Sequence, residues 1–99
     1  MRMIKKLVCQ LDDEIKGAER YAEKYMEAKV NGENEKKDMY FSMAQDELKH
    51  AMNIHSLTVD EIEKVRKVYT PPQDMIEKWN KEHELYVNKV AAIKSMLQV

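Results

Sequence analysis

Glu47 and His50 are the residues of this chain whose types and spacing most clearly predict chemistry. They lie three apart in a stretch, residues 39–57, whose composition is typical of a helix. Residues three apart project from the same face of a helix, one above the other. A carboxylate and an imidazole presented together inside a helical bundle can bind a metal ion. The pair therefore predicts a metal site, although it does not by itself predict a reaction.

Apolar residues recurring at steps of three and four predict the helices that must position this pair, over about residues 3–30, 34–57 and 72–98. The first helix should end at Asn31-Gly32, because both residue types accept the left-handed conformation that closes helices. The expected inward stripes are Ile4, Leu7, Leu11, Glu14, Ala18, Tyr21, Tyr25 and Ala28; then Tyr40, Met43, Glu47, His50, Ile54 and Leu57; then Ile76, Trp79, His83, Tyr86, Val90, Ile93 and Leu97.

The segment that follows the second helix admits two interpretations. Thr58 and Glu61 form a capping-box pattern, which would begin a separate short helix over residues 58–69. No glycine or proline interrupts the stretch, so the second helix could equally continue through it. The prolines at 71–72 are a firm boundary, since proline is tolerated in the first turn of a helix but not in its interior.

The only polar residue on the first stripe, Glu14, matches the position of the pair on the second. A short turn between the two helices makes them antiparallel, so residues equally far from the turn stand at equal height. This places Glu14 level with Glu47, and Leu11 level with His50. Two ionised carboxylates at one level repel each other, and a dication would remove that repulsion. We expect Glu14, Glu47 and His50 to bind metal; the alternative is that they reach water or a lysine.

His83 is the only polar residue on the third stripe, and its role depends on the path of the chain. If the segment after the second helix leaves the bundle, His83 stands level with His50 and can add a ligand. If the second helix continues instead, Ile93 faces Glu47 and the third helix supplies no ligand. A histidine satisfied within the core is the alternative for His83.

Other polar and aromatic residues have weaker predicted roles. Tyr21 and Tyr40 lie two turns from the glutamates and could form hydrogen bonds in the second shell of a metal, or could be ordinary core tyrosines. His55 lies off the stripe and is expected to be exposed. Glu82 and Glu84, on either side of His83, are expected to face solvent.

The arrangement Glu14 … Tyr21 … Glu47-Leu48-Lys49-His50 resembles the first half of rubrerythrin and its ferritin-like relatives. It is also similar to the encapsulated ferritins, whose subunits are about this short. The resemblance covers residues 4–57 and implies an all-α, antiparallel, ferritin-like bundle with a di-iron carboxylate site that oxidises Fe(II) with dioxygen or peroxide. It implies that Glu14 is a terminal or bridging carboxylate, Glu47 a bridging carboxylate and His50 a terminal imidazole. Manganese or zinc also suits such ligands.

The chain departs from that family because it has no second Glu-x-x-His after residue 50. Two subunits that place their first two helices together would restore four glutamates and two histidines, and would complete a four-helix core. We therefore expect a homodimer or a larger homo-oligomer with the metal at the subunit interface. The sequence leaves open whether a larger shell or another partner protein is involved.

Length and charge exclude several other classes of protein. Ninety-nine residues predict one domain, residues 1–99, and the net charge of −1 argues against nucleic-acid binding. No apolar run approaches the length of a membrane span, and the N-terminal region lacks the apolar core of a signal peptide. A single cysteine, Cys9, cannot form an internal disulfide, so a cytoplasmic location is expected.

Two functional hypotheses remain from the sequence. The first is a ferritin-like redox metalloprotein, either a ferroxidase or a peroxidase. The second is a small non-catalytic interaction protein of similar architecture that binds no metal, in which the polar residues on the stripes only set the register of the helices.

Overall fold

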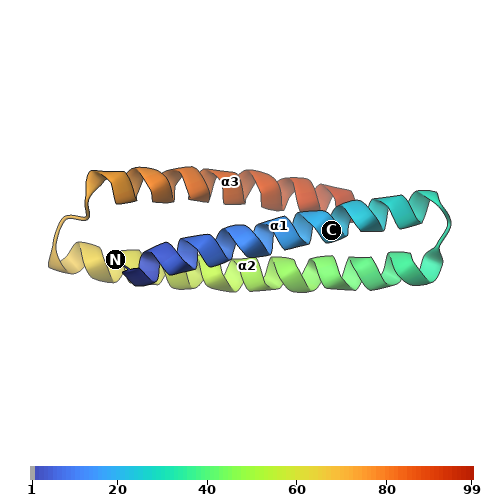
Figure 1. Ribbon diagram of the computed structural model, residues 1–99, viewed down its shortest axis with the longest axis horizontal. Helices are drawn as coiled ribbons and strands as arrows, with labels where there is room; N and C mark the ends of the chain where they lie inside the picture. The colour runs from blue at the N-terminus through green and yellow to red at the C-terminus, as the bar shows by residue number, and fades with distance from the viewer. Residues whose placement is uncertain (1) are drawn as a thin grey trace.

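The computed structural model describes residues 2–99, which form three α-helices and, over that range, no strand. The helices are α1 (Arg2–Val30), α2 (Asn34–Val68) and α3 (Gln73–Leu97). They lie lengthwise beside one another, and the chain turns back at each connection (Figure 1). The all-helical class and the three helices predicted from the sequence are thus confirmed. None of the helices within residues 2–99 has an apolar stretch that could cross a membrane.

The turn between α1 and α2 forms where the asparagine–glycine pair predicts it. Gly32 has a φ of 69°, in the left-handed region that glycine adopts without strain. Its neighbour Glu33 donates its backbone N–H to the carbonyl of Ala28, 2.9 Å away, as in a common helix C-terminal motif. This tight reversal places α2 directly against α1, which is the contact that positions the candidate site.

Helix α2 continues without interruption to Val68, so the separate short helix over residues 58–69 is not formed. Thr58 does not cap a new helix. Its side chain is fully buried, and its hydroxyl donates a 2.7 Å hydrogen bond to the carbonyl of Ile54. A threonine bonded in this way is satisfied inside a helix and leaves the helix unbroken. The helix ends only where Pro71 and Pro72 prevent its continuation.

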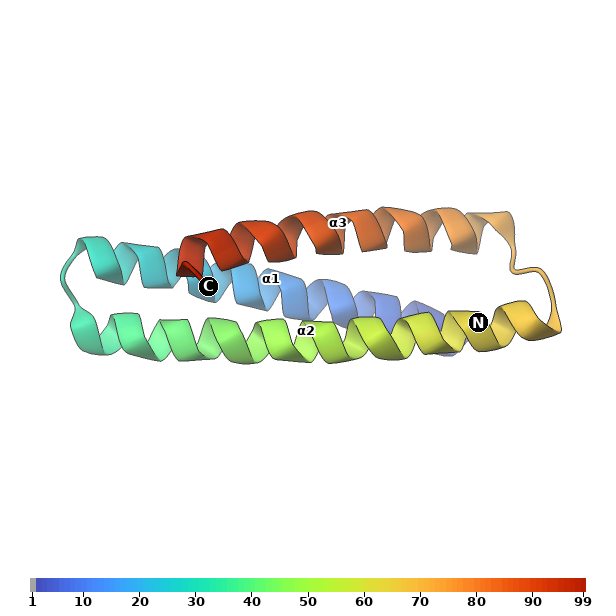
Figure 2. The same cartoon turned by 180° about the vertical axis from the view of Figure 1, so that it is seen from behind.

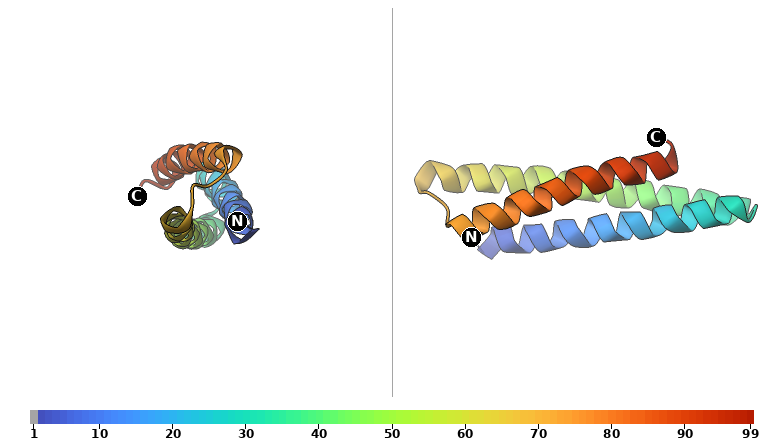
Figure 3. Two further views of the ribbon diagram at one scale, coloured as in Figure 1. Left: turned by 90° about the vertical axis from the view of Figure 1, so that its left-hand side faces the viewer. Right: turned by 90° about the horizontal axis from the view of Figure 1, so that it is seen from above.

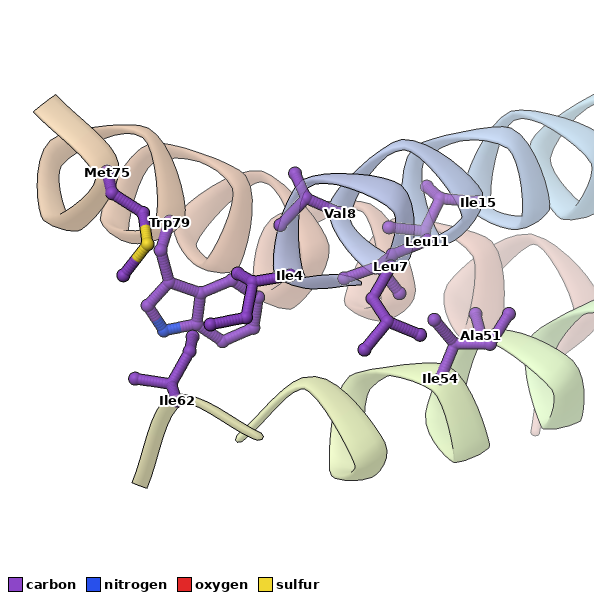
Figure 4. Close-up of a cluster of buried hydrophobic side chains, with 10 residues drawn as sticks. All are labelled: Ile4, Leu7, Val8, Leu11, Ile15, Ala51, Ile54, Ile62, Met75 and Trp79. Carbon is purple, nitrogen blue, oxygen red and sulfur yellow. The ribbon is translucent and has the colours of Figure 1, made fainter. Parts of the chain in front are cut away.

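The three helices enclose two apolar clusters. Seen end-on, α3 covers one side of the pair formed by α1 and α2, and it ends short of the α1–α2 turn (Figures 2 and 3). α1 packs most extensively against α2, and α3 packs mainly against α1. The first cluster contains Ile4, Leu7, Val8, Leu11, Ile15, Ala51, Ile54, Ile62, Met75 and Trp79 (Figure 4). The second contains Ala18, Ala22, Tyr25, Ala44, Leu48, Ile93 and Leu97.

The buried face of α2 is rotated by about one residue from the predicted stripe, whereas that of α1 keeps most of its predicted residues and is wider. On α1, Ile15 and Ala22 are buried in addition to the predicted core residues, and Glu14 and Tyr21 are half-buried. On α2, Thr58 is buried and Leu57 is 48% exposed, so the prediction that Leu57 faces the core is wrong. The physical reason is α3, which packs on one side of the pair and buries the residues of each helix that face it. The polar residues of the stripes therefore lie at the edge of the α1–α2 interface.

This rotation predicts unequal effects of two leucine truncations. Leu11→Ala removes a fully buried side chain and should lower the free energy of unfolding by about 2–4 kcal/mol. Leu57→Ala, the matched control, should lower it by about 1 kcal/mol or less, because that side chain already contacts water. Urea denaturation of both variants measures the difference. Equal losses would contradict the observed orientation of α2.

Candidate metal centre

Helices α1 and α2 bring Glu14, Glu47 and His50 together. Each residue offers one ligand atom, and these atoms lie within 4.8 Å of one another. Nδ1 of His50 is 3.6 Å from Oε2 of Glu14 and 3.8 Å from Oε1 of Glu47. The matched heights predicted from the sequence therefore correspond to real proximity. The role of these residues as ligands stays a prediction.

The cluster lies at the edge of the helix pair, on the side away from α3. Asp12 and Glu19 project toward α3, where Glu19 accepts a 2.6 Å hydrogen bond from Lys89. Each helical residue turns the direction by about 100°, so Glu14 projects to nearly the opposite side from Asp12. The side chains of Glu14 and Glu47 are 23% and 27% exposed, and that of His50 is 54% exposed. An ion from solvent could therefore reach the cluster without any movement of the helices.

The two carboxyl groups hold a proton between them. Glu47 is favoured in its protonated form because it can then hydrogen-bond to Glu14. Partial burial and the negative charge of Glu14 act in the same direction, and together these effects raise the pKa of Glu47 to about 7. His50 opposes them weakly. Near neutral pH the cluster thus carries a proton that a bound dication would displace.

Gly17 is a residue of the site that sequence reasoning missed. A Cβ atom at this position would lie 3.1 Å from Oε2 of Glu47, closer than ordinary van der Waals contact. The absence of a side chain therefore gives the Glu47 carboxylate room to lie over α1. The sequence held a signal, because Gly17 is the only glycine inside a helix and lies one turn from Glu14. A glycine there costs about 1 kcal/mol of helix stability relative to alanine.

Tyr21 and Tyr40 lie on the same edge, farther along the two helices. Their rings stack on each other with centroids 6.3 Å apart, and Nζ of Lys24 lies 5.6 Å from the centroid of Tyr40. The partners observed for these rings are thus each other and a lysine, and not the glutamates. Their predicted role in the second shell stays a prediction.

The structure does not bring His83 to the cluster. Because α2 continues past residue 57, Ile93 of α3 is fully buried beside Leu48, and α3 contributes no ligand atom to the trio. Nδ1 of His83 instead lies 2.8 Å from Nε2 of His55, which is half-buried and not exposed as predicted. Because α2 is continuous to Val68, α3 starts farther along the bundle, and His83 lies beside His55 instead of His50.

The two glutamates beside His83 differ from each other. Glu84 is exposed as predicted, but Glu82 is half-buried against α1. Burial, and then the nearby Asp12, raise the pKa of Glu82. The prediction that Glu82 faces solvent is therefore wrong.

Comparison of the chain with protein-family models, with curated proteins and with solved structures found no significant match.

The shared proton predicts how the stability of the metal-free protein changes with pH. Folding raises the pKa of Glu47 from 4.5 to about 7, so the folded protein binds more protons than the unfolded chain between these values. The free energy of unfolding should therefore fall as pH rises through this window, by an amount on the order of 1–3 kcal/mol. Denaturation in the presence of a chelator, at pH 5 and pH 8, measures the change.

Glu47→Gln should remove most of the fall in the free energy of unfolding between pH 5 and pH 8. Glu84→Gln, at an exposed position, should show the same fall as the wild type. A Glu47→Gln protein that loses as much stability as the wild type would show that another group causes the pH dependence.

The close approach at Gly17 predicts a coupling between two substitutions. Gly17→Ala in a Glu47→Ala background should raise the free energy of unfolding by about 1 kcal/mol, through helix propensity alone. In the wild type the same substitution should stabilise less, because the new methyl group displaces the Glu47 carboxylate. A double-mutant cycle by chemical denaturation measures the difference, and strict additivity would argue against the contact.

Proposed function

We propose that Glu14, Glu47 and His50 bind a divalent transition metal, and that the protein is a ferritin-like di-iron oxidase or peroxidase. The observation that carries this proposal is the convergence of two carboxylates and an imidazole within 4.8 Å. The three donors come from two helices and lie where solvent can reach them. Manganese and zinc are the other metals that this mixture of oxygen and nitrogen donors suits.

The protonation of the cluster supports a site for a cation. Two carboxyl groups that are partly removed from water share a proton when no cation is present, and this state raises the pKa of Glu47 to about 7. A dication replaces that proton and is held by both carboxylates. Its affinity should therefore rise with pH up to about 7 and change little above it.

A second copy of the chain would complete the centre in this proposal. One chain supplies only three ligands, on the edge of α1 and α2 that α3 leaves uncovered. Half-buried apolar side chains continue along this edge, including Tyr21, Tyr40 and Met43. An antiparallel four-helix core made from two such pairs would bury these side chains and bring together four glutamates and two histidines. This ligand set is the one that the resemblance to encapsulated ferritins implies.

Iron(II) is the substrate in the proposed reaction. Two Fe(II) ions each lose one electron, and a peroxide molecule takes up the two electrons and two protons to give two waters. With dioxygen as oxidant, the same two electrons and two protons give hydrogen peroxide. The carboxylates of Glu14 and Glu47 would hold the two ions near each other and balance the charge that increases on oxidation.

A non-catalytic helical interaction protein is the second candidate. The observation that favours it is that the cluster can satisfy itself without metal, since the two carboxyl groups share a proton and His50 lies within 4 Å of both. In that case the polar residues would only set the register of the helix pair.

Metal content and oligomeric state distinguish the two candidates. The chain is loaded anaerobically with Fe(II), and iron is measured per chain beside the mass in solution. We expect about one iron per chain in a dimer, and its loss in Glu47→Ala but not in Glu84→Ala. Half an iron per chain, still lost in Glu47→Ala, would mean that one ion is shared between two chains. No bound metal in the wild type would reject the redox proposal and leave the interaction protein.

A further inference from the structure

His55 and His83 form a pair of potential metal ligands that is separate from the carboxylate cluster. Nε2 of His55 on α2 and Nδ1 of His83 on α3 lie 2.8 Å apart. Within residues 2–99 this is the only side-chain hydrogen bond that joins α2 to α3. The backbones of the two helices approach each other less than those of the other pairs, since α3 packs mainly on α1. The pair therefore lies at the weakest of the three helix contacts.

Aromatic rings hold His55 in place. The ring of Tyr86 stacks on it with centroids 4.1 Å apart and planes 9° apart. Trp79 approaches from the same helix at 5.5 Å. Stacking on Tyr86 and contact with the tilted ring of Trp79 limit rotation of the imidazole, so packing sets the direction of its nitrogen before any ligand arrives. His83 is exposed, which leaves its side of the pair open to water and ions.

The surroundings favour the form of histidine that binds metals. Burial, and then the neighbouring His83, lower the pKa of His55. The lowered pKa favours the neutral ring, and a neutral imidazole is the form that ligates a metal. No other charged group contributes to this shift.

We propose that His55 and His83 together bind a transition-metal dication that prefers imidazole nitrogen, such as zinc, nickel or copper(II), and that this ion fastens α3 to α2. This site is independent of the function proposed for the carboxylate cluster, because it uses other residues and another helix pair.

Only a small change in the distance between the two nitrogens separates the observed hydrogen bond from a metal site. Two nitrogens bound to one tetrahedral zinc at about 2.05 Å stand about 3.3 Å apart. The observed separation of 2.8 Å must therefore widen by roughly 0.5 Å, which a small rotation of the exposed His83 ring provides. Water molecules from the open side would complete the coordination.

Metal binding by the pair requires a change of tautomer in one of the two rings. In the hydrogen bond, one of the two facing nitrogens carries a hydrogen and the other accepts it. On metal binding that ring changes tautomer, so its hydrogen leaves the facing nitrogen and the outer nitrogen of the same ring gains one. Both lone pairs then point to the metal, and the change of tautomer itself releases no proton.

The donor set separates this pair from the carboxylate cluster. Two imidazoles without a carboxylate suit zinc, nickel and copper, whereas magnesium and calcium require oxygen ligands. The cluster of Glu14, Glu47 and His50 offers two carboxylates and suits iron and manganese better. In a protein loaded with both kinds of ion, we therefore expect iron or manganese at the carboxylate cluster and zinc, nickel or copper at the histidine pair.

The test uses zinc as the probe in the full chain, with a Glu47→Gln/His50→Gln variant to weaken the first cluster. Zinc should still bind this variant at about one ion per chain, and a hundredfold excess over the dissociation constant should raise its Tm by about 10 °C. Adding His83→Ala should lower the association constant by about tenfold or more and abolish the rise in Tm. Glu84→Ala, one residue along α3, should change neither quantity.

Nitrogen chemical shifts of the histidine rings in the wild-type protein give a second measurement that needs no variant. Saturating zinc should shift Nε2 of His55 and Nδ1 of His83 and should leave the hydrogen of each ring on its outer nitrogen. Unchanged shifts at both nitrogens, or equal zinc affinity with and without His83, would overturn the proposal and leave an ordinary hydrogen bond.

Discussion

The close packing of α1 on α2 is the contact on which the rest of the structure depends. Small residues allow it, since Ala18, Ala22, Ala44 and Ala51 are completely buried between the helices. Because their side chains are short, the two backbones approach closely, and long side chains at the edge are pressed toward the opposite helix. Glu47 is the clearest case, since its carboxylate reaches over α1 at Gly17 and meets Glu14 there. The same closeness leaves α3 to pack on one side only.

The position of the cluster at the edge of this interface determines its electrostatics. A carboxylate pair buried at the centre would have to be neutral, and a pair in full contact with water would hardly interact. Glu14 and Glu47 lie between these limits, so the proton they share titrates close to neutral pH. A group with that property exchanges a proton for a cation under mild conditions, which a fully buried pair would resist. Because α3 covers only one side of the α1–α2 pair, the site at the other edge stays accessible.

Much of the site could be predicted from the sequence, and the reasons are physical. The three-and-four spacing and the glycine turn determine which residues of α1 and α2 share a height, so Glu14, Glu47 and His50 were found without a structure. Which way each helix faces could not be predicted, because that depends on where α3 packs. The local pattern at Thr58 was equally compatible with a cap and with a helix interior, and only its burial decided between them. The contact between His55 and His83 follows from that single difference, since it requires α2 to continue past residue 57.

The unbroken length of α2 also joins the two histidine-containing clusters mechanically. His50 and His55 are five residues apart, so they project about 140° from each other around one helix axis. A twist of α2 that carries Glu47 and His50 inward, toward α1, turns His55 relative to His83 by the same angle, because a regular helix transmits rotation along its axis. Glu47 and His55 are only about 12 Å apart along that axis, within one continuous helix. Because one continuous helix carries both sites, the orientation of the carboxylate cluster and that of the His55–His83 pair depend on each other.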